Sequence, residues 1–433
     1  MISQQASWRG SLNWRTRPRE VSASGLPGAA RIGAWPNLHG QMPALTGVRG
    51  LAVLMVLVFH FIGTVPPTNL VERAVVSVTN YGSYGVELFF VLSGFLITGI
   101  LYDTHDHPHY FRNFYIRRSL RIFPLYYGVL ALVFFVAPLI AVLRGPTLDF
   151  LVERQGWAWL YAVNIYIARQ GDWSFSYLDH FWSLSIEEHF YFVWPLVVFV
   201  LARRPRTLVA ASLAIATCAL LGRLIGSLEG LSWWTTYTLT PFRMDGLALG
   251  AFMAVAARQP GGLERLARAL PWVVAAAGGL LAGTHLWTHF APQAGVALIL
   301  PVRAALTLIL LACLLMWALI APERSVTSRF FCSRSMAWLG TYSYGLYVYH
   351  HFISYYLASN HTDVTLGAWL GSHSAAVALQ AALGIAASMG VAYLSYEYFE
   401  RRFLRLKRFF ETTERLEPAP SAPTPIVVRA GGS

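Results

Sequence analysis

The clearest shortage in this sequence is of charged residues. Only 12% of its 433 residues are Asp, Glu, Lys or Arg, whereas 56% are hydrophobic. Soluble domains are typically about a quarter charged. Lysine is nearly absent, with Lys407 the single example, so arginine carries most of the positive charge behind the net +12. This composition excludes an ordinary soluble domain and predicts an all-α, polytopic membrane helix bundle.

Cysteine is also scarce. Cys218, Cys313 and Cys332 show no metal-binding or disulfide spacing, so we expect inert thiols, no bound metal and no permanently bound cofactor. The arginines occur in short clusters between apolar runs. This pattern argues against nucleic-acid binding and favours the positive-inside distribution of membrane proteins.

Long apolar runs are abundant instead. A helix needs about 20 apolar residues to cross a bilayer. Ten runs approach that length, at 45–63, 83–102, 125–143, 182–202, 207–225, 236–257, 270–287, 300–320, 337–358 and 374–398. The shorter run 157–168 is expected to form an interfacial or re-entrant helix in an external loop.

The distribution of arginine predicts how these ten helices are oriented in the membrane. The even-numbered loops, such as 103–124, and both chain ends are arginine-rich, whereas the odd-numbered loops are poorer. Because basic residues concentrate in cytoplasmic loops, both termini are predicted to be cytoplasmic. We expect a disordered tail at 1–42, a transmembrane domain at 43–403, and a basic, then disordered, tail at 404–433.

Ionisable residues within apolar helices are costly and usually functional. Arg49 and His60 lie on nearly the same face of the first predicted helix, about 16 Å apart along its axis. Glu187 and Glu188 fall about 9 Å inside the outer end of the fourth helix, near the expected depth of His60. We therefore predict a histidine base polarised by a carboxylate, beside a buried hydroxyl-bearing substrate.

The acid at this site is less well defined. Adjacent glutamates point about 100° apart, so one would face the site and the other a structural partner, with Glu188 slightly preferred. Arg243 and Asp245 of the sixth helix could pair with each other or with Glu187. A catalytic and a structural role both stay open for Asp245.

Arginines near the predicted cytoplasmic surface indicate an anionic ligand. Arg118 and Arg121 share a helical face by their spacing. With Arg49 and Arg117 they could bind phosphates, although ordinary inside-positive charge is the alternative interpretation. A long anionic donor entering from the cytoplasm fits this layout, and acyl-CoA has that shape.

Six motifs, in the same order, resemble the bacterial acyltransferase-3 family of integral membrane O-acyltransferases, and the resemblance extends over about 45–403, most of the chain. They are LTGVRGLAVLMVLVFHF, GVELFFVLSGFLIT, FYIRRSLRIFPLYY, FWSLSIEEHFYFVWP, FRMDGLALGAF and LGTYSYGLYVYHH. The resemblance implies transfer of an acyl group, with acetyl expected, from cytoplasmic acyl-CoA to a hydroxyl of a cell-surface or lipid-linked glycan. It also implies a multi-pass protein of the bacterial inner membrane.

The resemblance assigns roles to the matching residues. It implies a catalytic base at His60 with its paired Arg49, a donor-associated pair at Arg118 and Arg121, and an essential acid at Glu187 or Glu188. Two residues depart from the family pattern: Thr46 replaces a frequent Asp, and His189 replaces the usual Gln, which adds a titratable group near the expected centre. No soluble hydrolase-like domain follows the tenth helix, so we expect the chain to act alone or with a separate partner.

The predicted substrate-binding residues are Trp182, Arg243, Tyr347 and His350. Trp182 could stack on a sugar ring or belong to an interfacial aromatic belt. His350 and His351 could pack among aromatic residues or line the acceptor site. A zinc site formed by these histidines stays open, although no spacing in the sequence supports it.

The alternative function is a transporter whose His, Glu and Asp residues form a proton or substrate path. It predicts inverted repeats, and the sequence shows none. No Ser or Cys lies in a nucleophile motif, which favours direct transfer, while an acyl-histidine relay stays open. Expected partners are acyl-CoA, a glycan acceptor and the lipid bilayer; homo-oligomerisation stays open.

Overall fold

A computed structural model describes residues 36–38, 40, 42–291 and 295–410, and within these ranges it contains helices and no strand. The first group of helices is α1 (Pro43–Val58), the π-helix η1 (Phe59–Gly63), α2 (Leu70–Thr79), η2 (Asn80–Tyr84), α3 (Gly85–Asp103), α4 (Tyr110–Ala131), η3 (Leu132–Val136), η4 (Ala137–Leu139), η5 (Ala141–Leu143), α5 (Pro146–Glu153), α6 (Gly156–Trp159), α7 (Val163–Gln170), η6 (Ser176–Leu178) and α8 (Phe181–Leu201). The second group is α9 (Pro205–Leu228), α10 (Trp233–Thr238), α11 (Thr240–Arg258), α12 (Gly262–Phe290), α13 (Val296–Ile320), α14 (Val326–Phe331), α15 (Arg334–Ser359), α16 (Thr362–Leu370), α17 (His373–Ser395), η7 (Tyr396–Glu400), α18 (Arg401–Arg405) and η8 (Leu406–Phe410).

Eight helical segments of the described chain are long and apolar enough to cross a membrane. The chain is therefore a polytopic helical membrane protein. The other two predicted spans form α11 and α15, which have 19 and 26 residues. Polar residues such as Arg243, Asp245 and the His350–His351 pair make these two helices less apolar than the eight. The cytoplasmic position of both termini stays a prediction.

The predicted boundaries were wrong around the third span. The helical segment starts at Tyr110 and runs to Leu139, so the arginines of the predicted loop 103–124 lie largely on a helix. Aromatic and aliphatic residues alternate with these arginines at helical spacing, which explains the early start. The segment 157–168 falls on the short helices α6 and α7, too short to span. Most of the two predicted tails lies outside the described residues.

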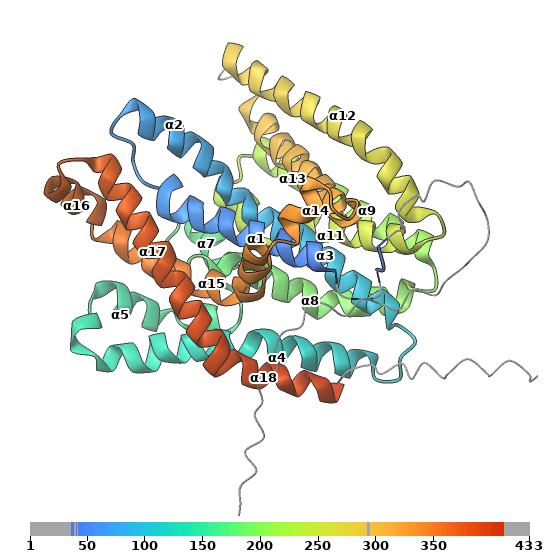
Figure 1. Cartoon of the computed structure of the whole chain (residues 1–433), viewed down its shortest axis with the longest axis horizontal. Helices are drawn as coiled ribbons and strands as arrows, with labels where there is room; N and C mark the ends of the chain where they lie inside the picture. The colour runs from blue at the N-terminus through green and yellow to red at the C-terminus, as the bar shows by residue number, and fades with distance from the viewer. Residues whose placement is uncertain (1–35, 39, 41, 292–294, 411–433) are drawn as a thin grey trace, which may run out of the picture. The chain divides into compact units, whose positions relative to one another are not determined.

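Glycines let the central helices pack closely. α1 packs against α15, and α3 packs against α11 (Figure 1). A Cβ added to Gly94 of α3 would collide with the carbonyl oxygen of Leu247 on α11, and one added to Gly340 of α15 with that of Thr46 on α1. Small residues permit such backbone-to-backbone contact between helices in membranes. These contacts hold together the four helices that carry most of the site.

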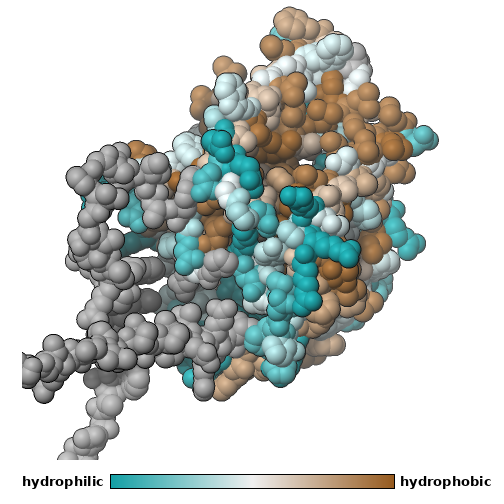
Figure 2. Space-filling view, turned by 90° about the vertical axis from the view of Figure 1, so that its right-hand side faces the viewer, coloured by the Kyte–Doolittle hydropathy of each residue, from teal (hydrophilic) through white to brown (hydrophobic). Residues whose placement is uncertain are grey.

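Hydrophobic side chains also cover the outside of the bundle. α12 packs along α13, yet few of its side chains are buried, and Trp272 is 77% exposed. Figure 2 shows hydrophobic residues over much of one face, beside a band of hydrophilic residues. Helices that are apolar on their outer faces are typical of lipid contact.

Candidate active site

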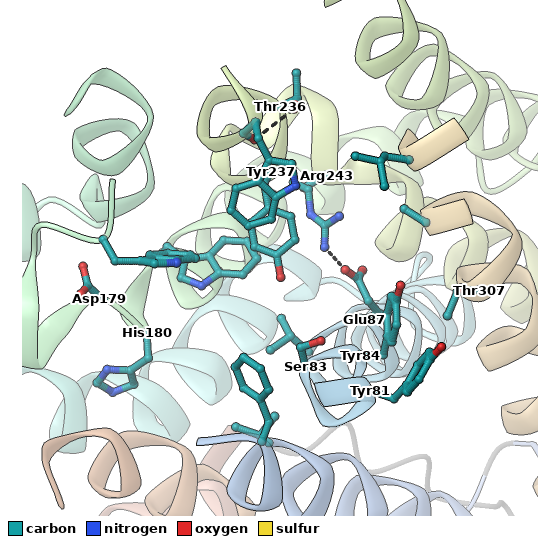
Figure 3. A pocket seen from close by; sticks show the side chains of 18 of the residues that line it. Tyr81, Ser83, Tyr84, Glu87, Asp179, His180, Thr236, Tyr237, Arg243 and Thr307 are labelled. Carbon is teal, nitrogen blue, oxygen red and sulfur yellow. Dashed lines mark hydrogen bonds and ion pairs between the residues drawn. The ribbon is translucent and has the colours of Figure 1, made fainter. Parts of the chain in front are cut away.

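A cavity of about 870 Å³ opens among the helices. Its wall is formed by segments far apart in the sequence. Figure 3 shows Glu87 of α3, Tyr237 of α10 and Arg243 of α11 pointing toward one another, with His180, ahead of α8, farther to the left. Cavities of this size with a few convergent polar groups are typical of small-molecule sites. We call it the histidine cavity.

Four histidines gather at this cavity. The ring centroid of His60 lies 4.8 Å from that of His350 and 5.2 Å from that of His351. The His180 centroid lies 4.8 Å from that of His351. His60, His180 and His351 line the cavity, and His350 is fully buried. The structure therefore brings together His60 and His350, both singled out from the sequence, and adds His180, which sequence reasoning missed.

His60 lies in the π-helix η1, which directly follows α1. Such widened turns are rare and often occur at functional sites. The Nδ1 atom of His60 lies 3.0 Å from the carbonyl oxygen of Val56. Because a carbonyl oxygen can only accept, Nδ1 carries the proton, and in the neutral ring Nε2 is the acceptor. This tautomer is the one that a general base acting through Nε2 requires.

Two buried ion pairs brace the helices around the cavity. Arg243 of α11 pairs with Glu87 of α3, and Asp245 of α11 pairs with Arg223 of α9. The predicted pairing of Arg243 with Asp245 or Glu187 is therefore wrong, because each residue has a partner on another helix. Arg243 lines the histidine cavity, whereas Asp245 does not. Its position fits a structural role better than the predicted catalytic one.

A second cavity, of about 100 Å³, is lined by most of the residues predicted to bind the acyl donor. Its charged lining residues are Arg49 of α1, Arg118 and Arg121 of α4, and Glu187 of α8. The guanidinium carbon of Arg118 lies 4.6 Å from the ring centroid of Tyr191. Arg117 is on the same helix but does not line this cavity. We call it the arginine cavity.

The two glutamates of α8 have different surroundings. Glu187 accepts hydrogen bonds from Ser93 and Tyr191, each at 2.9 Å, in the arginine cavity. Glu188 lines neither of these two cavities, and its Oε1 is buried with no hydrogen-bond partner among the described residues. The geometry thus favours Glu187 as the acid at the site, contrary to the slight preference for Glu188.

The expected meeting of these glutamates with His60 does not occur. Glu187 lies nearly two turns into α8, which begins at Phe181. His60 instead contacts His350 and His351, which pack against His180 ahead of that helix. The depth argument placed both groups in one layer but could not resolve a difference of two turns. His189, the departure from the family motif, lies 2.7 Å from the Thr240 hydroxyl and lines neither cavity.

Tyr347 and Val86 line both cavities. The Tyr347 hydroxyl lies 2.5 Å from the Ser183 hydroxyl and also donates to the carbonyl oxygen of His180. Tyr347, predicted to bind substrate, therefore stands where the arginine cavity meets the histidine cavity. The predicted Trp182 lines the histidine cavity alone.

Asp179 is a buried acid that sequence reasoning missed. Its Oδ1 accepts a hydrogen bond of 2.7 Å from the backbone N–H of Phe175. Burial disfavours the carboxylate and raises the pKa of Asp179 to about 8. Burial, with a contribution from the neighbouring histidines, lowers the pKa of His180 well below its ordinary value. At neutral pH this segment therefore presents a protonated carboxyl group next to a neutral imidazole.

These features define a class: a polytopic membrane protein whose bundle encloses an arginine-lined and a histidine-lined cavity that meet at one tyrosine. The family model described as an acyltransferase domain matches residues 42–397. The chain therefore belongs to this acyltransferase family, which confirms the resemblance seen in the motifs.

Several curated proteins are similar to the chain. One named "Putative peptidoglycan O-acetyltransferase YrhL", from Bacillus subtilis, is 29% identical over 72% of this chain and 48% of its own length. One named "Peptidoglycan O-acetyltransferase OatA", from Listeria monocytogenes, is 28% identical over 72% of this chain and 49% of its own length. A Staphylococcus aureus protein named "Putative O-acetyltransferase SAS0844" is 32% identical over 37% of this chain and 25% of its own length. The chain thus spans about half the length of the first two relatives, and no solved structure matches it.

Proposed function

We propose that the chain is an integral membrane O-acyltransferase. It would move an acyl group, with acetyl expected, from cytoplasmic acyl-CoA to a hydroxyl of a cell-surface or lipid-linked glycan at the bacterial inner membrane. The observation that carries the proposal is the pair of cavities that share Tyr347 and Val86. Family membership supports it, and the names of two relatives make peptidoglycan or its precursor the leading acceptor.

The arginine cavity suits one end of the donor. Arg49, Arg118 and Arg121 offer charged donors of the kind that bind phosphate oxygens. At about 100 Å³ the cavity is too small for a nucleotide, and a pantetheine arm would pass through it only if the lining side chains moved apart. We place the phosphates at its arginine-rich mouth, with the thioester arm passing Tyr347. Glu187 would offset the positive charge and position the arginines.

The histidine cavity suits the acceptor and the chemistry. Nε2 of His60 would take the proton of the acceptor hydroxyl as its oxygen attacks the thioester carbonyl carbon. The carbon–sulfur bond breaks, and the thiolate of CoA leaves and receives the proton from the His60 imidazolium. The remaining volume, lined by Trp182, Trp173 and Tyr237, gives aromatic surface for a sugar ring.

Acyl transfer by the purified chain in nanodiscs tests this proposal. Acetyl-CoA would be supplied with peptidoglycan fragments, lipid-linked saccharides and simple sugars as acceptors, and acetylated products measured by mass spectrometry. We expect transfer by the wild type and a loss of at least about 100-fold in His60→Gln, the scale of general-base catalysis. His289→Gln is the control, because His289 is exposed and lines neither cavity.

Two results would overturn parts of the proposal. Equal turnover by the wild type and His60→Gln would show that the chain is an acyltransferase but that His60 is not its catalytic base. If the chain neither binds nor turns over any acyl-CoA, the donor assignment is wrong. The alternative is then a transport path through the same polar residues.

A further inference from the structure

The clustered histidines share one hydrogen-bonding pattern. Nδ1 of His350 lies 2.7 Å from the carbonyl oxygen of Tyr347, and Nε2 of His351 lies 3.2 Å from that of Ser176. His60 makes the same kind of bond through Nδ1. Since carbonyl oxygens only accept, each bonded nitrogen carries a proton. The second nitrogen of each neutral ring therefore keeps its lone pair.

These remaining nitrogens need a partner. Nε2 of His350 and Nδ1 of His351 are buried and have no hydrogen-bond partner among the described residues. One ring nitrogen from each of His60, His350 and His351 lies within 4.8 Å of the other two. Buried polar atoms without partners are rare in native proteins. Lone pairs that face one another repel unless a cation or a proton donor lies between them.

We propose that His60, His350 and His351 form a binding site for a divalent transition-metal ion, with zinc as the best fit. Imidazole nitrogens suit zinc, and three histidines with one open position are a common zinc geometry. Metal-bound histidines usually donate their second N–H to a carbonyl or carboxylate, as all three rings do here. No carboxylate is needed to complete such a site.

The geometry requires only a small adjustment. Zinc–nitrogen bonds of about 2.0–2.1 Å place tetrahedral ligand nitrogens about 3.3 Å apart. The present limit of 4.8 Å therefore calls for modest side-chain rotation. His60 and His351 line the histidine cavity, so the open position of the ion would face the acceptor space.

This site goes beyond the proposed function and does not rest on it. The proposed base uses the same Nε2 lone pair of His60 that would bind the ion. A bound ion would therefore block the proposed base, so the acyl-transfer assay is run on protein stripped of metal.

Metal content of the full-length chain tests the site without any measurement of turnover. The protein would be purified in detergent with a histidine-free tag, stripped with a chelator, dialysed against zinc and then against metal-free buffer. Elemental analysis should find about one zinc per chain, and cobalt in its place should give the visible absorption of a tetrahedral site.

Variants that each remove one proposed metal-binding histidine test where the ion binds. His350→Gln and His351→Gln should each weaken zinc binding by at least about tenfold. Elution as a single monodisperse species would show that a variant is folded, and either variant suffices for the test. His289→Gln should bind zinc like the wild type.

Three outcomes would overturn the proposal. They are no zinc on the wild type, wild-type affinity in the folded cluster variants, and loss of zinc from His289→Gln to the same extent as from those variants. Failure of acyl transfer would leave the metal result unaffected, so the two proposals are judged separately.

Discussion

Asp179 lies next to His180 in the short segment before α8, and both residues line the histidine cavity. Its pKa of about 8 makes the free energy of unfolding depend on pH. Its ordinary pKa is 3.8, so between pH 4 and 8 the folded chain binds more protons than the unfolded one. Stability from the protonated carboxyl is fully present below pH 4 and is lost as pH rises toward 8. A difference of one between the pKa in the folded chain and that in the unfolded chain changes the free energy of unfolding by ~1.4 kcal/mol.

Asp179→Asn should remove this pH dependence. The amide oxygen can still accept the Phe175 N–H, and no charge needs to be buried. Relative to wild type, the variant should gain stability as pH rises from 4 to 8, by at least about 1.4 kcal/mol at the upper end. Thermal unfolding in detergent measures this, with exposed Glu229→Gln as the control. A constant difference between Asp179→Asn and wild type over this range would contradict the assignment.

Single residues show clearly what the sequence reveals and what it does not. Arg49 and His60 were found because ionisable groups stand out in an apolar run. Glu87 had the same signal in GVELFF and was overlooked. The choice between Glu187 and Glu188 depends on which face of α8 meets the arginines, which requires the arrangement of three helices. His180 precedes its helix, so helical periodicity gave no indication of it.

At the scale of elements, the ion pair between Glu87 and Arg243 joins α3 to α11. Their side chains are only 8% and 2% exposed. Removing one partner leaves a buried charge uncompensated, which typically costs about 3–5 kcal/mol. Glu87→Gln or Arg243→Gln should therefore lower the unfolding free energy by about this amount, measured by denaturant or thermal unfolding in detergent.

The double variant Glu87→Gln/Arg243→Gln distinguishes pairing from packing. It buries no unpaired charge, so it should be more stable than the sum of the two single losses predicts. Asp106→Asn, which breaks the exposed Arg203–Asp106 pair, should leave the unfolding temperature nearly unchanged. Strictly additive losses in the double variant would show that the pair is not coupled.

The elements themselves were largely predictable. Apolar runs of the right length gave the spans, and the weak run 157–168 fell on helices too short to span. The start of α4 was missed because its arginines were interpreted as loop charges, although they lie on a helix that lines the arginine cavity. α11 and α15 carry polar site residues, which lower their mean hydropathy. Composition alone therefore does not class them with the other eight spans.

For the whole molecule, the predicted ten-span topology depends on whether α15 crosses the bilayer. Its 26 residues reach about 39 Å, more than the roughly 30 Å hydrocarbon core. Cys332 lies exposed before α15, and Asn360 lies exposed after it. In a background without Cys218 and Cys313, a membrane-impermeant thiol reagent should label Cys332 from the cytoplasmic side.

The second label completes this topology test. Asn360→Cys, in a background that also has Cys332→Ser, should react only from the outer side. The change of side follows from a single crossing by α15. Labelling of both positions from one side would show that α15 does not span, and the predicted positions of the later loops would have to be revised.

We propose that the two cavities have separate roles: the arginine cavity would hold the donor, and His60 would perform the chemistry in the histidine cavity. The most direct test is acetyl-CoA affinity and single-turnover rate measured together on wild type, His60→Gln and Arg118→Gln. Exposed Arg112→Gln on the same helix serves as the control.

The two variants should show opposite patterns. His60→Gln should keep wild-type Kd and lose at least about 100-fold in rate. Arg118→Gln should weaken Kd by about tenfold, as expected for one lost charge-assisted contact, with a smaller effect on rate at saturation. If Arg118→Gln binds acetyl-CoA like the wild type while His60→Gln loses binding, the division between the two cavities is wrong.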